Sequence, residues 1–386
     1  MMQPIMGQFS IDASHFGIVA AFYYYGYAGM QIPVAMLLDR FSARTVIFMF
    51  AILCGLATIL FTYSNHWYLA CISRFLIGVG SAAGFLGVSK VVSEWFPKTQ
   101  YTKMIGFSFT IGLLGAIYGG KPISLLIEHY YWKNIATGLA IASIVIAFGS
   151  LCCLRSSAFP KQQEEQSFQI NHFKALLSSP IIWSLAIANL LMVGSLEGFS
   201  DVWGVPYLMT AYGISKANAA ELISFVFFGM LLGGPLLSTL SNYLGKYRVI
   251  SLCGIGMALL FAWLLSCHQY NGWLFAVIFF SIGIMCCYQV IIFAVGADLV
   301  DNKSLGVTVA FLNCINMLGG SFFHTIIGAL MDYFWMGSMG TNGIKQYDVM
   351  AYHYALVAIP ICAVMGAVII SILGLKGTRY HRLDCS

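Results

Sequence analysis

Charged residues are scarce in this chain, and their scarcity excludes most classes of soluble protein. Only 9% of the 386 residues are Asp, Glu, Lys or Arg, whereas 60% are hydrophobic and 15% are aromatic. A soluble protein of this size would have too little polar surface to cover its fold with such a composition. Most of the chain must therefore lie in lipid, and the bilayer is the first partner that the sequence predicts.

Several motifs that would indicate other functions are also missing from the sequence. The eleven cysteines include no Cys-x-x-Cys and the histidines have no ligand-like spacing, so we expect no metal site and no cofactor. There is no Gly-x-x-x-x-Gly-Lys-Ser/Thr stretch for ATP, and no His-Glu-x-x-His, Gly-x-Ser-x-Gly or clustered Asp motif of an intramembrane enzyme. The first 15 residues lack the basic segment of a cleavable signal. We therefore expect a small-molecule solute as the partner, no nucleic acid, and no enzyme activity.

What the sequence has instead is eleven long apolar runs. Each is about 20 residues long, the length of a helix that crosses ~30 Å of hydrocarbon. Strands of a membrane barrel would appear as alternating segments of ~10 residues, so these continuous, Gly-rich runs indicate helices. The predicted fold class is an all-α polytopic membrane protein. The predicted spans are Phe16 to Leu38, Thr45 to Tyr63, Trp67 to Val92, Ile105 to Ile127, Asn134 to Leu154, Ile181 to Leu208, Ala219 to Leu240, Val249 to Cys267, Trp273 to Val295, Leu305 to Leu330 and Tyr354 to Leu373.

Lysines and arginines are distributed unevenly between the two ends of these spans. Fourteen of the 19 lie in loops on the side of Asp39, Arg74 lies within a span, and four lie on the other side, namely Lys121, Lys133, Lys216 and Lys345. The positive-inside rule then makes the Asp39 side cytoplasmic. We expect a protein of the cell membrane, in a bacterium the inner membrane, with the C-terminus inside and the N-terminus outside.

A short polar turn occurs twice in the sequence. The stretches "QIPVAMLLDRFSARTVIFMF" (31–50) and "GGPLLSTLSNYLGKYRVISL" (233–252) each contain a Pro-bearing span that ends in a basic turn. Asn242 takes the place of Asp39, 203 residues later, and six spans separate the turns, so the repeating unit is six helices. The predicted organisation is an N-terminal half with five spans (1–154), a cytoplasmic linker (155–179), a C-terminal half with six spans (180–375) and a cytoplasmic tail (376–386). The first half is one helix short, so we expect either an internal start methionine or a truncated form.

The first of these turns resembles the signature of the major facilitator superfamily. The family has Gly-x-x-x-Asp-Arg-x-Gly-Arg-Arg between its second and third helices, and "MLLDRFSAR" departs from it with Ala35 and Ser42 at the Gly positions and Arg44 alone of the final basic pair. "RFLIGVGSAAG" (74–84) is similar to the family's Arg-bearing fourth helix, and "EWFPKTQYTK" (94–103) to the loop after it. "EGFSDVWGVPYLMTAYGISKANAA" (197–220) is similar to the seventh helix of members that carry organic anions, sugar acids, amino acids or small peptides. The resemblance covers the chain apart from the first helix, and implies a monomeric secondary transporter of twelve-helix plan.

The resemblance implies that the two polar turns act as gates. Asp39 would hold the halves together on the cytoplasmic side when the transporter faces outward, near the start of the helix at Leu305, whose positive N-terminal end favours a carboxylate. Such a contact biases a rocking equilibrium without binding solute. The alternative is that the charges only fix the topology. The residues of the gating turns are Asp39, Arg40, Arg44, Asn242, Lys246 and Arg248.

Ionisable residues inside the spans are the main candidates for a solute or proton site, because each costs on the order of 2.5 to 3.5 kcal/mol to insert. Arg74 lies ~10 Å along its helix from Trp67 and suits a substrate anion or a proton-linked ion pair, with a structural ion pair as the alternative. Glu197 lies near mid-depth, in a segment whose glycines and Pro206 loosen a helix. Asp201 follows one turn later on the same face, unless it reaches the outer interface. A carboxylate in such a place suits a proton or a substrate amine.

Other polar residues in the spans are candidates for the wall of the same site. Tyr24, Tyr27 and Gln31 share a helix face through their i, i+3, i+7 spacing. Each polar group could instead make an ordinary hydrogen bond between helices, at ~0.6 kcal/mol. The remaining candidates are Gln289, Asn313, Asn316 and His324.

The predicted function is secondary active transport of a small polar solute by alternating access around a site at the membrane midplane, coupled to protons. Arg74 together with Glu197 would suit a zwitterion such as an amino acid or small peptide. Arg74 alone, with proton coupling at Glu197, would suit an organic anion. The alternatives are a solute/solute exchanger without proton coupling, a non-transporting truncated form, and a channel.

Overall fold

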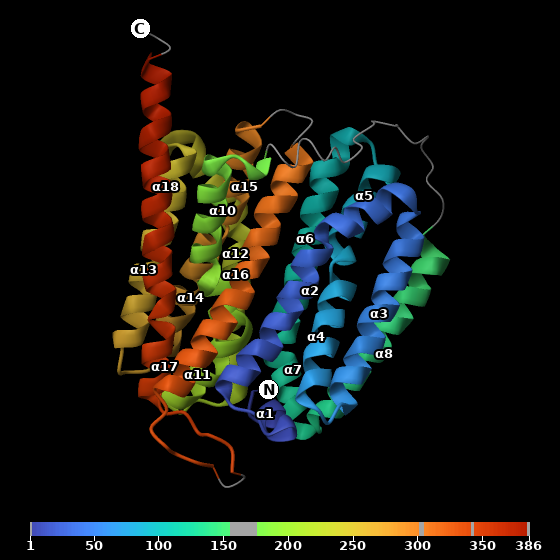
Figure 1. Ribbon diagram of the computed structural model, residues 1–386, viewed down its shortest axis with the longest axis vertical. Coiled ribbons are helices and arrows are strands. Elements are labelled where there is room, and N and C mark those ends of the chain that lie inside the picture. Colours follow the sequence, from blue (N-terminus) through green and yellow to red (C-terminus); the bar gives the residue numbers. More distant parts are fainter. Residues whose placement is uncertain (1, 155–175, 301–304, 341–342, 384–386) are drawn as a thin grey trace.

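The computed structural model describes residues 2–154, 176–300, 305–340 and 343–383, and nearly all of them belong to helices (Figure 1). No strand occurs in these ranges, and Met339 and Lys345 form a single isolated β-bridge. The helices of the first part of the chain are α1 (Met2–Phe9), α2 (Ala13–Arg40), α3 (Ala43–Tyr63), α4 (Trp67–Ser81), α5 (Ala83–Trp95), α6 (Lys98–Gly119), α7 (Lys121–His129) and α8 (Trp132–Cys153). Those of the second part are α10 (Pro180–Met192), α11 (Gly204–Tyr212), α12 (Lys216–Leu244), α13 (Lys246–Ser266), α14 (Gly272–Cys286), α15 (Tyr288–Asp298), α16 (Leu305–Tyr333), α17 (Val349–Leu356) and α18 (Ala358–Leu383).

Ten stretches of helix in the described ranges are long and apolar enough to cross a membrane. They coincide with ten of the eleven predicted spans, and they confirm the all-α polytopic membrane fold. The remaining predicted span, Phe16 to Leu38, lies in α2. This helix is 28 residues long but carries four tyrosines and Gln31, polar side chains that reduce its hydropathy. The ten stretches are Ala43–Tyr63, Trp67–Trp95, Lys103–His129, Trp132–Cys153, Pro180–Tyr212, Lys216–Leu244, Lys246–Ser266, Gly272–Asp298, Gly306–Tyr333 and Val349–Leu375.

The helix ends follow from local sequence. Asp12 caps α2 by accepting a hydrogen bond from the backbone N–H of His15, and Ser42 and Ser215 cap α3 and α12 in the same way. Gly245 ends α12 with a φ of 86°, a left-handed conformation that favours glycine. The second polar turn is therefore a tight reversal.

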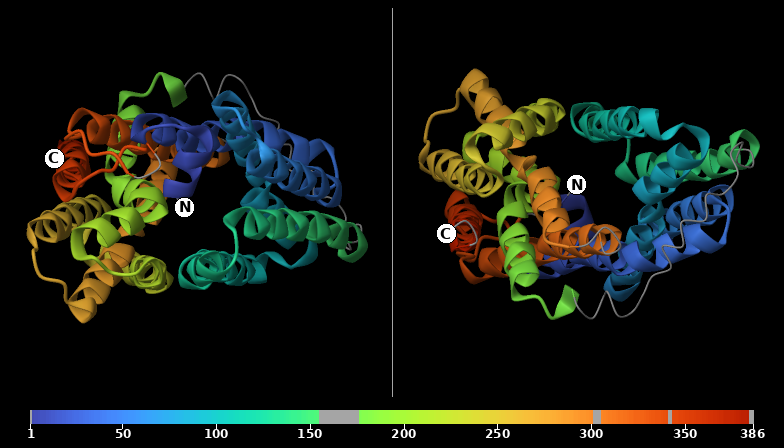
Figure 2. Two further views of the ribbon diagram at one scale, coloured as in Figure 1. Left: turned by 90° about the horizontal axis from the view of Figure 1, so that it is seen from below. Right: turned by 90° about the horizontal axis from the view of Figure 1, so that it is seen from above.

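Helix packing follows the same scheme in the two parts of the chain. In the first part α2 packs on α4 and α3 on α8; in the second, α12 packs on α14 and α13 on α18. Seen from its two ends, the molecule has α2–α8 gathered on one side and α10–α18 on the other (Figure 2). We call these the N-terminal and C-terminal groups. They meet where α2 packs along α16 and where α6 and α7 pack on α12.

Reciprocal glycines allow the closest helix contacts in each group. A Cβ on Gly26 of α2 would overlap the carbonyl oxygen of Phe75, and one on Gly78 of α4 would overlap the carbonyl oxygen of Tyr23. Gly229 of α12 and Gly283 of α14 are related in the same way to the backbones of α14 and α12. Gly229 follows Gly26 by the same 203 residues that separate the two polar turns. The repeat predicted from the turns therefore extends to the packing of the helices.

The two ends of the chain lie at opposite ends of the bundle (Figure 1). We call the end with α1, the start of α2 and the loop between α16 and α17 the Asp12 face, and the opposite end the Asp39 face. Helix α18 continues to Leu383, so residues 376–383 prolong the last helix where the sequence predicts a tail. Residues 155–175 of the predicted linker lie outside the described residues.

Candidate functional site

A hydroxyl group from one helix group meets two carboxylates from the other near the centre of the bundle. Tyr24 of α2 lies with its Oη 2.7 Å from Glu197 Oε2 and 2.9 Å from Asp201 Oδ2. Both distances are those of O–H···O hydrogen bonds. Three of the residues that the sequence singles out separately therefore form one cluster.

The two carboxylates belong to an irregular part of their span. Between α10 and α11 the chain forms a 3₁₀ turn (Val193–Ser195) and then a π-helix (Leu196–Trp203). The loosening that the glycines predict thus takes the form of a changed hydrogen-bond pattern in a continuous helix. Gly194 and Gly198 let the ring of Phe323 in α16 approach the backbone there. Short π-helical segments are frequent at functional sites.

His324 of α16 completes the cluster. Its Nε2 lies 3.4 Å from Asp201 Oδ2, and its ring centroid lies 5.4 Å from that of Tyr24. The imidazole is fully buried, and neither ring nitrogen has a hydrogen-bond partner among the described residues. Gly320, one turn earlier in α16, leaves room for the Tyr24 ring, since a Cβ there would collide with it. The side chain of Asp201 is 46% exposed although it lies between α2 and α16, so water can reach it.

Arg74 approaches the cluster from the other side. Its guanidinium lies over the ring of Tyr23, with Cζ 5.1 Å from the ring centroid, and Tyr23 packs edge-on against Tyr24. Arg74 is half-buried in α4 and interacts electrostatically with Asp201. It forms no ion pair with any carboxylate that the structure describes. A buried cation without a close counter-ion is suited to bind an anion.

The remaining candidates lie nearby in smaller sets. Tyr27 stacks on Tyr23 and contacts Gln31. Asn316 Nδ2 lies 3.4 Å from Gln289 Oε1, which joins α16 to α15. Asn313 is half-buried in α16 and makes no polar contact with these residues in the described ranges. Buried polar atoms without a described hydrogen-bond partner remain at Gln31 Nε2, Gln289 Nε2 and Asn316 Oδ1.

The gating turns lie on the Asp39 face. Arg40 and Arg44 are exposed at the α2–α3 turn, as are Asn242 and Arg248 at the α12–α13 turn. Lys246 forms an ion pair with Asp298 at the end of α15. The expected contact between Asp39 and the helix that starts at Leu305 involves side chains that lie outside the described residues.

A charged cluster that the sequence did not reveal joins the two helix groups at the Asp12 face. Lys345 Nζ lies 3.3 Å from Asp12 Oδ2 and 3.0 Å from Asp332 Oδ1. Asp332 also accepts a hydrogen bond from the backbone N–H of Ser14, and Tyr347 Oη accepts one from the N–H of Ala13. Residues 12–14 begin α2, whereas the other three residues lie at the end of α16 and in the loop after it. This cluster therefore links the two groups where α2 meets α16.

Proton affinities in this cluster reflect the same contacts. Burial raises the pKa of Asp12, but hydrogen bonds from the backbone and ring of His15 and the charges of His15 and Lys345 outweigh it, so the pKa falls to about 2. Burial lowers the pKa of Lys345, but Asp332 and Asp12 raise it above the usual value. Burial and the neighbouring Asp332 raise the pKa of Tyr347. The carboxyl of Asp12 and the ammonium of Lys345 are therefore ionised at neutral pH.

A second ion pair closes the other junction between the groups at the same face. Lys121 Nζ, at the start of α7, lies 2.7 Å from Glu221 Oε2 in the first turns of α12. Two of the four cations on the sparsely charged side thus connect the helix groups. From the sequence we predict only that these lysines lie on the same side of the membrane, because a lysine at the end of a span is too common to indicate a partner.

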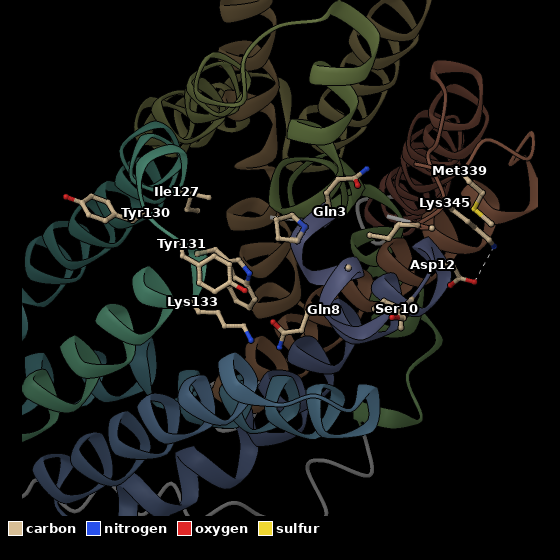
Figure 3. A pocket seen from close by; sticks show the side chains of 16 residues that line it. Gln3, Gln8, Ser10, Asp12, Ile127, Tyr130, Tyr131, Lys133, Met339 and Lys345 are labelled. Carbon is tan, nitrogen blue, oxygen red and sulfur yellow. Dashed lines mark hydrogen bonds and ion pairs between the residues drawn. The ribbon is translucent and has the colours of Figure 1, made fainter. Parts of the chain in front are cut away.

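A cavity of about 1080 Å³ opens at the Asp12 face (Figure 3). Polar and aromatic side chains line it, including Gln3 and Gln8 of α1, Tyr131 of the α7–α8 turn, Lys133 in the first turn of α8, and Lys345. None of the central candidates lines this cavity. No group of three His, Cys, Asp or Glu in the described residues has the arrangement of a metal site.

These helices and their central polar cluster are those of a multi-pass membrane protein. The sequence model of the Major Facilitator Superfamily matches residues 1–323 and, in a second match, 202–376. The chain belongs to this superfamily, as the resemblance of its motifs indicates.

Several relatives of this chain are named as transporters, all of low sequence identity, and one, UhpC of Salmonella typhimurium, is named as a membrane sensor protein. The uncharacterized transporter YybO of Bacillus subtilis is 23% identical over 85% of this chain and 81% of its own length. The probable galactarate/D-glucarate transporter GudP of the same organism is 22% identical, with 83% and 78% covered. The galacturonate transporter of Dickeya chrysanthemi is 23% identical, with 63% and 76% covered.

Solved structures share the fold. The nucleoside transporter NupG superimposes with a TM-score of 0.76 at 12% identity, covering 95% of this chain and 94% of its own. A bacterial homologue of the human lysosomal transporter Spinster, in an inward-facing and occupied conformation, gives a TM-score of 0.72 at 18% identity, with 96% and 90% covered.

Proposed function

We propose that this protein is a secondary active transporter that moves a small organic anion of the sugar-acid type by alternating access, in symport with protons. The observation that carries the proposal is the place of Arg74, half-buried in a span beside the central carboxylates and without an ion pair to a described carboxylate. A guanidinium presents a fork of donors that matches a carboxylate in two parallel hydrogen bonds. The names of several relatives, among them the transporters for galactarate, glucarate and galacturonate, support an anionic solute.

Proton coupling is the second part of the proposal. Moving an anion into a cell against an inside-negative potential costs a free energy of about 2.3 kcal/mol per elementary charge for each 100 mV. A proton carried with it cancels that term. Glu197 is suited to carry the proton because it lies in the middle of a span, half-buried, with the hydroxyl of Tyr24 as its hydrogen-bonding partner.

The closure at the Asp12 face supports a carrier in which the two groups rock. Asp12, Lys345 and Asp332 at one junction, and Lys121 and Glu221 at the other, close the same face of the bundle. Opening this face requires that both sets of ion pairs separate. The predicted cytoplasmic side of Asp39, the cell membrane and the monomeric state belong to this proposal.

A zwitterionic solute is the second candidate. The exposed carboxylate of Asp201 and its neighbour Glu197 would accept an amine, while Arg74 would bind the carboxylate of the same molecule. Amino acids and short peptides have this pair of charges.

Uptake into proteoliposomes of the purified protein tests the proposal. We expect counterflow of a labelled sugar acid that saturates with concentration, and accumulation when a pH gradient is imposed, which a protonophore abolishes. Arg74→Gln should abolish both counterflow and accumulation, and Lys133→Gln, which removes a lysine in the first turn of α8, serves as the control. Saturating counterflow without response to pH would indicate an exchanger. Flux that does not saturate would indicate a channel, and preference for amino acids would favour the zwitterion.

A further inference from the structure

We propose that Glu197 and Asp201 hold one proton between them through the hydroxyl of Tyr24, and that this shared proton fastens the two helix groups at the centre of the bundle. This inference rests on the proposed proton coupling and assigns Tyr24 a role within it. Tyr24 is a positioning residue and proton relay, whereas Glu197 is the group that carries the proton.

The argument starts from the number of hydrogens available. A tyrosine hydroxyl has one hydrogen to donate and lone pairs to accept with. The two carboxylates lie 2.7 and 2.9 Å from the same Oη. If both were ionised, the hydroxyl could donate to only one of them, and the oxygen of the other would face Tyr24 Oη without a hydrogen between the two atoms. If one carboxyl is protonated, it donates to Tyr24 while Tyr24 donates to the other. Both short contacts are then hydrogen bonds, so the geometry accommodates one proton on the pair.

The surroundings decide which carboxyl carries the proton. Asp201 faces His324 at 3.4 Å and the positive charge of Arg74, so its ionised form is favoured. Glu197 has Tyr24 as its hydrogen-bond partner and the charge of Asp201 one turn away, which disfavours a second negative charge. The other titratable groups that face the pair are uncharged at neutral pH. They are Tyr23 and Tyr27 of α2, Cys286 of α14 and Tyr288 of α15.

The shared proton connects protonation to the contact between the helix groups. Tyr24 belongs to α2, and its ring is held between Gly320 and His324 of α16. When Glu197 loses its proton, one hydroxyl hydrogen remains for two negative carboxylates, and the contact across the groups weakens. Deprotonation therefore favours their separation.

The same hydrogen bonds provide a route for the proton. Glu197 passes its hydrogen to Tyr24 Oη as Tyr24 passes its own hydrogen to Asp201, so that Tyr24 stays neutral and the proton has moved by one carboxyl. Asp201, whose side chain is 46% exposed, then releases the proton to water. Removing the hydroxyl of Tyr24 therefore removes the hydrogen bonds between the two helix groups and interrupts the path of the proton.

The test compares Tyr24→Phe with Tyr25→Phe, which removes the hydroxyl of the next residue on the same helix, an exposed tyrosine with no hydrogen bond to either carboxylate. Counterflow is measured without a pH gradient across the neutral range, and accumulation is measured with one. A hydrogen bond to a charged group changes such an equilibrium by about tenfold or more. We expect Tyr24→Phe to lose about tenfold in driven accumulation, to keep counterflow, and to show a flattened pH profile. Tyr25→Phe should behave like the wild type.

The outcomes separate this inference from the proposed function. Wild-type protein that exchanges solute but ignores the pH gradient would overturn the proton coupling itself. If transport by both the wild type and Tyr24→Phe responds to the pH gradient, and the pH profile of Tyr24→Phe is unchanged, only the hypothesis of the shared proton would be overturned. Infrared difference spectra of the purified protein provide a second measurement that needs no transport. One protonated carboxyl band should be present in the wild type and absent in Glu197→Gln. In Asp201→Asn the band should titrate at a lower pH than in the wild type, because the neighbouring negative charge is gone. A band that remains in Glu197→Gln would also contradict the assignment.

Discussion

Asp332, at the end of α16, accepts a hydrogen bond from the backbone N–H of Ser14 in the first turn of α2, at 2.6 Å. A carboxylate of the C-terminal group thus caps a helix of the N-terminal group, where unpaired N–H groups and the helix dipole favour negative charge. The cap exists only while the Asp12 face is closed.

We therefore expect Asp332→Asn to shift the protein toward conformations that are open at the Asp12 face. Loss of one charge-assisted hydrogen bond costs about 1.5 to 3 kcal/mol. A cysteine introduced at Ser14 should react faster with a membrane-impermeant thiol reagent, by about tenfold or more. Asp348→Asn is the matched control, because Asp348 caps α17 within its own group. Equal labelling of both variants would show that Asp332 does not hold the face closed.

The lowered pKa of Asp12 predicts an acid dependence of stability. The folded-state pKa is about 2 and the ordinary value is 3.8, so the ionised carboxyl contributes stability above 3.8 that is lost as the pH falls through 2. The melting temperature of the wild type should exceed that of Asp12→Asn by a constant amount above this window, and the difference should close within it. Thermal unfolding in detergent at a series of pH values measures this. A difference that is independent of pH would exclude the contacts of Asp12 as its source.

The ion pair of Lys121 and Glu221 should contribute little energy but act specifically across the groups. Both side chains are largely exposed, at 40% and 47%, so water screens the pair and we expect a coupling of about 0.5 kcal/mol. Lys121→Glu should weaken closure at the α7–α12 junction, and the double exchange with Glu221→Lys should restore it. Single-molecule distances between labels on the two groups measure closure in all four proteins. A double variant that remains as open as the single ones would exclude a direct pairing.

Close packing of α2 on α4 predicts a strong effect of a single methyl group. Gly26→Ala should destabilise the protein by about 1 to 3 kcal/mol, because the new Cβ has no space against the carbonyl of Phe75. Gly29→Ala, one turn along the same helix, meets no atom within 4 Å and should be neutral or slightly stabilising. Thermal unfolding of the two variants gives the comparison, and equal melting temperatures would contradict the packing.

Neutralising the proton carrier should separate exchange from accumulation. Glu197→Gln keeps a hydrogen-bonding partner for Tyr24, as the protonated acid does, so we expect counterflow to persist without response to pH and driven uptake to be lost. Both rates come from the same proteoliposomes. Driven uptake that survives would exclude Glu197 as the proton carrier.

The sequence was sufficient to predict the helices because each span is long, continuous and apolar. It was also sufficient to single out Glu197, Asp201, Tyr24 and His324 one by one, since polar groups in lipid are costly. It could not predict that they meet, because Tyr24 and Glu197 are 173 residues apart and the contact depends on how the two groups pack.

The ion pairs at the Asp12 face could not be predicted from the sequence for a different reason. Asp12, Asp332 and Lys345 lie at the ends of spans, where charge costs little and indicates no partner. The glycine pairs, by contrast, were present as a signal. Gly26 and Gly229 have the spacing of the two polar turns, and a search for small residues at that interval would have found them.

The reciprocal glycines also determine which helices can move. Because the backbones of α2 and α4 lie in contact through Gly26 and Gly78, these helices cannot slide past each other without a collision, and the same holds for α12 and α14. We therefore expect each pair of helices to move as one rigid body. The seams between the two groups, α2 against α16 and α7 against α12, also contain a close backbone contact, because Gly17 of α2 and Gly328 of α16 leave no room for a Cβ. Any change of shape that exposes the centre of the molecule must therefore separate this backbone contact as well as the ion pairs.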